Sequence, residues 1–93
     1  MRREGDRVLV EGPITLDTVP ALAQAFEVHL AAGAALVDLG SVTDVDSSAV
    51  ALVLEWRRQA EGRKIDLRMA NPPPALQNLA KLYGVLELLP PGR

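Results

Sequence analysis

Cysteine is absent from this chain of 93 residues, and aromatic residues are scarce. Without a thiol the chain cannot form a disulfide, a thiolate nucleophile or a zinc site built on cysteine. Only 3% of the residues are aromatic, although 48% are hydrophobic. We therefore expect a core built mainly from leucine, valine, alanine and isoleucine, in a chain long enough for one small domain.

The chain also has no excess of basic residues and no long apolar run. It carries 10 basic and 12 acidic side chains, a net charge of −2, which argues against a nucleic-acid partner because such a partner requires a basic face. A membrane-spanning helix needs about 20 apolar residues in succession, and none is present. The start, residues 1–6, is charged and does not resemble a signal peptide. We expect a soluble cytoplasmic protein with no direct membrane insertion.

Strand-like and helix-like patterns alternate along the chain. Strands are predicted at residues 7–11, 34–39 and 65–69, with a short last strand or turn at 86–89. Helices are predicted from a cap at Asp17 or Thr18 to a C′ residue at Gly33, from Ser47 to Gly62, and over residues 75–82. This order predicts an α/β domain over residues 1–93, with its core at about 7–89. A mixed sheet of four to five strands should carry about three helices packed on one side.

A polar turn leads into the second predicted helix. Asp44, Asp46, Ser47 and Ser48 stand where the helix exposes N–H groups that lack partners within the helix. One serine, with help from Asp46, can cap the helix; the turn can dock a partner; or Ser47 can be phosphorylated. The two carboxylates disfavour a phosphate and favour a partner that offers arginine or lysine.

Signals for catalysis, metal binding and nucleotide binding are missing. His29 is the single histidine, and no acid or serine accompanies it in the sequence, so a triad is improbable and His29 should lie on the surface. Two carboxylates on one loop do not make a metal site. No glycine-rich phosphate loop is present. The sequence predicts no enzyme activity and no cofactor.

Trp56 has two interpretations. The expected inner stripe of its helix runs through Val50, Val53, Leu54 and Arg57, which places Trp56 at the flank. Burial against the sheet is the default for a tryptophan in a small aliphatic domain. The alternative is a second docking patch made by Trp56 with Arg57 or Arg58, because tryptophan and arginine are enriched at binding hot spots. Tyr83 is expected to pack beneath the last helix.

Residues 37–42 and 45–52 together resemble the STAS domain, found in anti-sigma factor antagonists and in the tails of sulfate transporters. Residues 16–20, 55–58 and 79–85 are most similar to the small, MlaB-like STAS subunit of the Mla-type phospholipid ABC transporter. The resemblance implies a cytoplasmic subunit that binds without catalysing and docks on the transporter's ATPase at the inner membrane. It also implies a role in phospholipid trafficking and outer-membrane lipid asymmetry.

The resemblance to anti-sigma factor antagonists implies a different partner, an anti-sigma kinase that phosphorylates the serine directly after the aspartate, here Ser47. Ala49 departs from the family pattern, which usually has glycine there, and its methyl group is expected to crowd a partner's backbone. Self-association as a homodimer stays open. The predicted partner-binding residues are Asp46, Ser47, Ser48, Ala49, Val50, Trp56 and Arg57.

Overall fold

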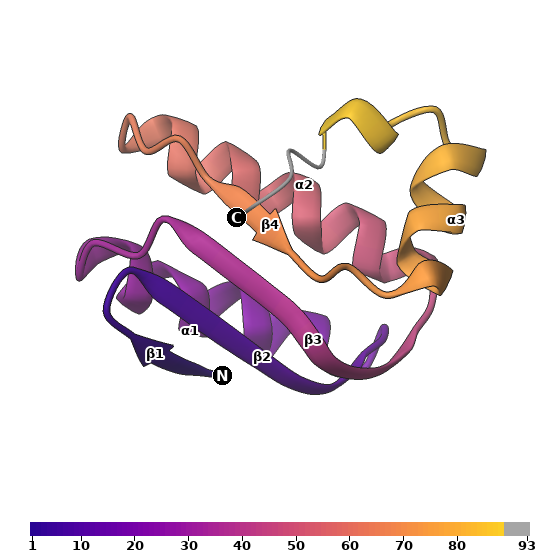
Figure 1. The fold of residues 1–93 in the computed structure, drawn as a ribbon, viewed down its shortest axis with the longest axis horizontal. Coiled ribbons are helices and arrows are strands. Elements are labelled where there is room, and N and C mark those ends of the chain that lie inside the picture. Colours follow the sequence, from indigo (N-terminus) through magenta and orange to yellow (C-terminus); the bar gives the residue numbers. More distant parts are fainter. Residues whose placement is uncertain (89–93) are drawn as a thin grey trace.

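Four strands and three α-helices make up residues 1–88, the part of the chain that the computed structural model describes (Figure 1). The strands are β1 (Arg2–Glu4), β2 (Arg7–Ile14), β3 (Leu36–Val45) and β4 (Arg68–Ala70). The helices are α1 (Val19–Ala31), α2 (Ser47–Gly62) and α3 (Pro74–Leu82), followed by a short 3₁₀ helix, η1 (Leu86–Leu88).

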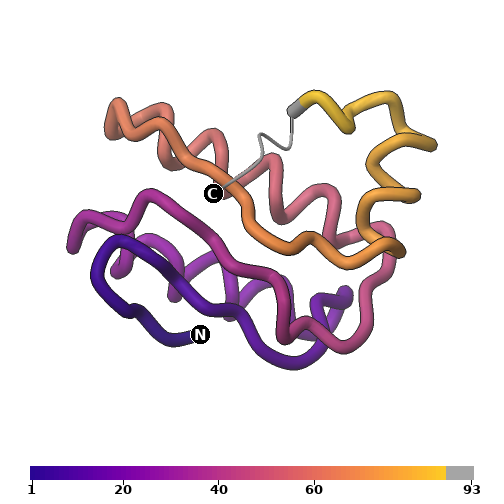
Figure 2. The backbone as a smooth tube through the Cα atoms, viewed as in Figure 1, coloured from indigo at the N-terminus to yellow at the C-terminus, as the bar shows by residue number. Residues whose placement is uncertain are grey.

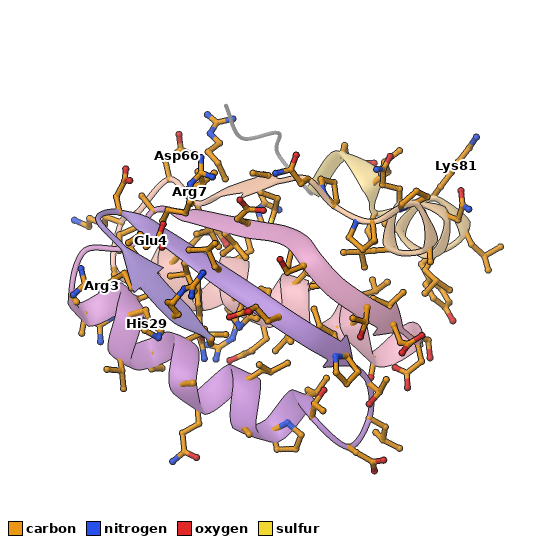
Figure 3. The ribbon with its side chains drawn as sticks, turned by 60° about the horizontal axis from the view of Figure 1, so that its bottom comes forward. Arg3, Glu4, Arg7, His29, Asp66 and Lys81 are labelled. Atoms are coloured by element: carbon orange, nitrogen blue, oxygen red, sulfur yellow. The ribbon has the colours of Figure 1, made fainter. Side chains whose placement is uncertain are left out.

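The strands form one mixed sheet in the order β1-β2-β3-β4. β1 is antiparallel to β2, whereas β3 is parallel to both of its neighbours, β2 and β4. The connections β2-α1-β3 and β3-α2-β4 cross in the same direction, so with the usual right-handed crossover both helices cover the same face of the sheet. Figures 1 and 3 show this layer, and α3 packs against α2. The predicted α/β fold with a mixed sheet and three helices is confirmed.

The core lies between the sheet and this helical layer. The central strands point alternate valines and leucines inward, as the period of two requires. Phe26 of α1 and Trp56 of α2 are both fully buried, and their ring centroids lie 5.0 Å apart at a tilt of 39°. The two largest side chains of the core therefore join the two helices over the sheet.

β3 is longer than the predicted strand at residues 34–39, and two bulges explain why. At two places β3 uses one residue more than β2 between successive pairs. The flanking pairs are Leu9–Asp38 and Glu11–Ser41 at the first bulge, and Gly12–Val42 and Ile14–Val45 at the second. The segment that looked like a polar turn is therefore a bulged continuation of the strand. Bulges disturb the alternation of buried and exposed residues from which strands are predicted.

Other boundaries differ because they depend on pairing partners. β1 was not predicted; it forms because Gly5, at φ 64°, turns the charged start back along β2. β4 spans Arg68–Ala70 and not 65–69, since only these residues pair with β3. η1 replaces the strand or turn predicted at 86–89, of which residue 89 lies outside the described part.

Tyr83 does not pack beneath the last helix. Its exposed fraction is 55%, because α3 ends at Leu82 and the chain turns at Gly84, which has a φ of 72°. Within residues 1–88, no helix has both the length and the apolar character that crossing a membrane demands.

Candidate docking site

The site predicted from sequence lies where β2 and β3 end and α1 and α2 begin. Asp46 is the N-cap residue of α2, with extended backbone at φ −127° and ψ −172°. One carboxylate oxygen, Oδ1, accepts the N–H of Ser48 at 2.9 Å and the hydroxyl of Ser48 as well. The other, Oδ2, accepts the N–H of Leu16 at 3.0 Å, from the turn between β2 and α1. Asp46 therefore caps α2 and bridges two turns that are distant in sequence.

These hydrogen bonds favour the charged form of Asp46. The hydroxyl of Ser48, followed by the backbone N–H of Leu16, holds the pKa of this carboxyl below its ordinary value. Both oxygens are engaged within the domain. Asp46 therefore fixes the geometry of the site, and its contact with a partner stays a prediction.

The two serines differ in exposure and in bonding. Ser48 is half-buried and its hydroxyl is held by Asp46. Ser47 is exposed, and its hydroxyl has no hydrogen bond to any side chain or backbone group of residues 1–88. Neither serine is the N-cap residue, a role that Asp46 takes. Of the two hydroxyls, that of Ser47 can meet a partner without first breaking a bond within the domain.

Ala49 and Val50 were predicted to contact a partner, and this prediction is wrong. Ala49 is 0% exposed and Val50 is 6% exposed, because both point from the first turn of α2 into the core. The methyl group of Ala49 therefore cannot crowd a partner's backbone.

The proposed second patch at Trp56 and Arg57 is not part of this site. Trp56 is 0% exposed, so the default interpretation, burial, is correct and direct contact with a partner is excluded. Arg57 lies about 15 Å farther along the helix axis than Ser47, at 1.5 Å per residue. Its side chain is 36% exposed and lies 3.9 Å from Glu61, toward the other end of the molecule.

Leu16 belongs to the site although sequence reasoning missed it. Its side chain is 74% exposed, and its N–H binds the same carboxylate that caps α2. A leucine between Thr15 and Asp17, in the turn after β2, is the signal that was available. Exposed leucines are common singly, but one beside a free serine offers an apolar anchor for a partner.

The two turns and the helix start that form this site carry acidic side chains and no basic ones. Residues 8–56, which supply them, contain no lysine or arginine, whereas Asp17, Asp44 and Asp46 stand at the site; the basic residue Lys81 is on α3 (Figure 3). Asp17 and Asp44 are exposed and have no ion pair within residues 1–88. We define the docking edge as Leu16, Asp17, Asp44, Asp46 and Ser47. It is an acidic surface with one apolar anchor and one available hydroxyl.

The opposite end of the domain holds the cations of the N-terminal strands. Arg3 and Arg7 lie there together with His29, as Figure 3 shows. His29 is half-buried on α1, away from the docking edge, and burial followed by the charge of Arg3 lowers the pKa of its imidazole. Within the described residues, no three acidic or histidine side chains gather as a metal site would require.

Comparison with known proteins places this fold in a class, the STAS domains. A family model described as "Mlab, STAS domain" matches residues 1–90, so the chain belongs to this family of STAS domains. The predicted resemblance to the STAS domain is confirmed at that level. No curated protein matches the chain.

A solved structure has the same fold. The anti-sigma factor antagonist SpoIIAA in its unphosphorylated form matches with a TM-score of 0.70, over 94% of this chain and 78% of that chain. The sequence identity is 17%, so the match shows the fold alone.

Proposed function

We propose that this chain is a non-enzymatic STAS subunit that docks on the ATPase of an Mla-type phospholipid ABC transporter and supports its activity. The observation that carries the proposal is the docking edge: Leu16 and Ser47 stand exposed on an acidic surface that contains no basic residue. The name of the matching family model, Mlab, supports the choice of partner. On this proposal the subunit is cytoplasmic, attached to the inner membrane only through the transporter, and contributes to outer-membrane lipid asymmetry.

The chemistry of the edge suits such a partner. Asp17 and Asp44 would attract a basic surface and accelerate association, while Leu16 would fill an apolar pocket. Ser47 would donate or accept one hydrogen bond at the centre. Catalysis by this chain is not part of the proposal, because the docking edge holds no histidine or lysine that could act as a general base for Ser47.

Co-purification tests this proposal. The chain, tagged and co-expressed with the Mla-type ATPase of the same genome, should retain it on the affinity resin. Ser47→Arg should abolish retention, since it places a large cation where the partner is expected to be basic. Ala31→Arg is the matched control, because Ala31 is also exposed on a helix, at the other end of the domain. Equal retention by all three proteins would overturn the docking edge.

An anti-sigma factor antagonist is the second candidate, favoured by the exposure of Ser47 and by the fold of SpoIIAA. In this alternative a cognate anti-sigma kinase transfers the γ-phosphate of ATP to the Ser47 hydroxyl. Mass spectrometry after incubation with kinase and ATP would detect one added phosphate, lost in Ser47→Ala and kept in Ser48→Ala. Light scattering of the isolated chain would show whether the subunit also forms a homodimer.

A further inference from the structure

A groove adjoins the docking edge between the end of β3 and the start of α3. Its volume is about 160 Å³, and it is lined by Val42, Thr43, Asp44, Val45, Pro73 and Ala75. Figure 2 shows these two segments side by side, although they are separated by 28 or more residues in sequence. The second bulge of β3 lies between the pairs made by Val42 and Val45, so it shapes this wall of the groove.

The groove combines apolar walls with one carboxylate. Val42, Val45, Pro73 and Ala75 offer hydrocarbon, whereas Asp44 is exposed and its carboxylate forms no ion pair or hydrogen bond with the described residues. No lysine or arginine occurs between residues 8 and 56 to neutralise it from the same wall. This combination fits a side chain with a long aliphatic stem and a cationic head.

The helix end at the groove would oppose a cation only weakly. The start of an α-helix normally presents several free N–H groups with positive partial charge. Here Pro74 has no N–H, and the N–H groups of Leu76 and Gln77 both donate to the carbonyl of Pro73, at 3.0 and 3.1 Å. Only Ala75 keeps a free N–H in this turn, so the Asp44 carboxylate dominates the local charge.

We propose that this groove receives a basic side chain, lysine or arginine, of the docked partner, with its stem between the end of β3 and α3 and its charge on Asp44. This inference rests on the proposed function for the identity of the partner. It extends the contact from the docking edge to α3, which the docking proposal alone does not involve.

Two substitutions test separately the apolar contact of the bound side chain's stem and the ionic contact of its head. Ala75→Leu fills the groove with apolar atoms and keeps Asp44, while Asp44→Asn keeps the groove and removes the charge. Each should weaken binding to the ATPase about tenfold, the scale of one hydrogen bond to a charged group. Only Asp44→Asn should reduce the salt dependence of the affinity. Ala31→Leu and Asp6→Asn, exposed sites at the other end, are the matched controls and should bind as the wild type does.

The double variant Ala75→Leu/Asp44→Asn decides whether both changes act on one side chain. If they do, the affinity of the double variant should be little lower than that of the single variant that binds less tightly, because the contact with the same bound side chain cannot be lost twice. If the fold-losses of affinity of the two single variants multiply in the double variant, or if Ala75→Leu binds normally, the proposed binding of one basic side chain in the groove is wrong. If Ser47→Arg still abolishes binding in that case, the docking proposal stands and only the groove fails.

A partner-independent measurement covers the case in which the ATPase does not bind. N-acetyl-arginine amide, titrated into the isotope-labelled chain, should shift the amide resonances of Thr43, Asp44 and Ala75. These shifts should disappear in Ala75→Leu and should be absent with N-acetyl-norleucine amide, which has a stem but no charge. Shifts located elsewhere, or none at these three residues, would reject the groove whatever the partner is.

Discussion

The two ends of the sheet differ in how their charges are paired. Toward the amino ends of the parallel strands, Arg7 lies 2.9 Å from Asp38 and Arg68 lies 2.8 Å from Asp66, although Arg3 and Asp6 have no ion pair within residues 1–88. At the carboxyl ends, Asp17 and Asp44 are exposed without a cation among the described residues. A paired charge is largely neutralised by its partner, whereas an unpaired carboxylate can attract a cation from outside the domain. On the proposed function, the first end supports the fold and the second serves recognition.

The largest effect should come from the core beneath both ends. Trp56→Ala should lower the free energy of unfolding by about 3–5 kcal/mol, because it leaves a cavity between α1 and α2. Trp56→Phe should cost only roughly 1 kcal/mol, since the indole Nε1 has no hydrogen-bond partner in the described structure. Chemical denaturation measures both. If the Trp56→Ala variant kept its full stability but lost binding, Trp56 would contact the partner. That result would contradict the assignment of recognition to the acidic end alone.

Asp46 should give the next largest effect. Asp46→Ala removes the cap of α2 and the bridge to Leu16, so the Tm should fall by roughly 4–8 °C, the usual effect of losing a cap in a small domain. Asp46→Asn can still cap the helix and should lose less. Thermal unfolding followed by circular dichroism distinguishes the two variants. Equal Tm values for wild type and Asp46→Ala would show that the bridge is not stabilising.

The same carboxylate predicts how stability depends on pH. Hydrogen bonds lower the pKa of Asp46, mainly from Ser48, and of Asp38, mainly from the N–H of Gly40. The contribution of each carboxylate to the free energy of unfolding is therefore complete above the unfolded-state pKa of about 3.9. It is lost as the pH falls through the lower folded-state pKa. Stability should decline on acidification below about pH 4, less steeply in Asp46→Asn. Denaturation at a series of pH values would reveal an unchanged slope if this assignment is wrong.

Reversing the unpaired acids should change binding but not folding. Asp17→Lys/Asp44→Lys should alter the free energy of unfolding by less than about 0.5 kcal/mol, because both sites are exposed. It should slow association with a basic partner roughly tenfold at low salt and less at high salt. Stopped-flow or biosensor kinetics measures this rate. An unchanged rate at low salt would mean that the acidic end does not steer recognition.

The smallest effect is expected from the paired end. Arg63→Gln removes a surface ion pair, with Glu27 at 3.4 Å, that should contribute at most about 1 kcal/mol. Partner affinity should not change. If Arg63→Gln reduced the affinity as much as Asp17→Lys/Asp44→Lys does, both ends would take part in binding and the proposed distinction between them would be wrong.

The sequence allowed the fold to be predicted more fully than the site. Helix α2 was expected from Ser47 to Gly62 and forms over those residues, because a polar start, an apolar stripe and a terminal glycine are local signals. β1 and the bulged half of β3 were missed, since both depend on pairing with β2 rather than on their own pattern.

The direction of Trp56 was missed for a different reason. The inner stripe was drawn through Leu54 and Arg57, but the buried face of α2 passes through Leu52, Val53 and Trp56. A helix that packs against a sheet and two other helices buries a broad arc, so one stripe cannot define what is exposed. The place of Leu16 at the site likewise depends on a hydrogen bond from its N–H to Asp46, across 30 residues of sequence.

Because one carboxylate holds both the start of α2 and the turn that carries Leu16, the apolar anchor and the Ser47 hydroxyl keep a fixed spacing before any partner arrives. A preorganised pair of contacts loses little conformational entropy on association. The domain should therefore bind nearly as a rigid body, and cutting the Asp46 bridge should weaken a complex by releasing the turn that carries Leu16.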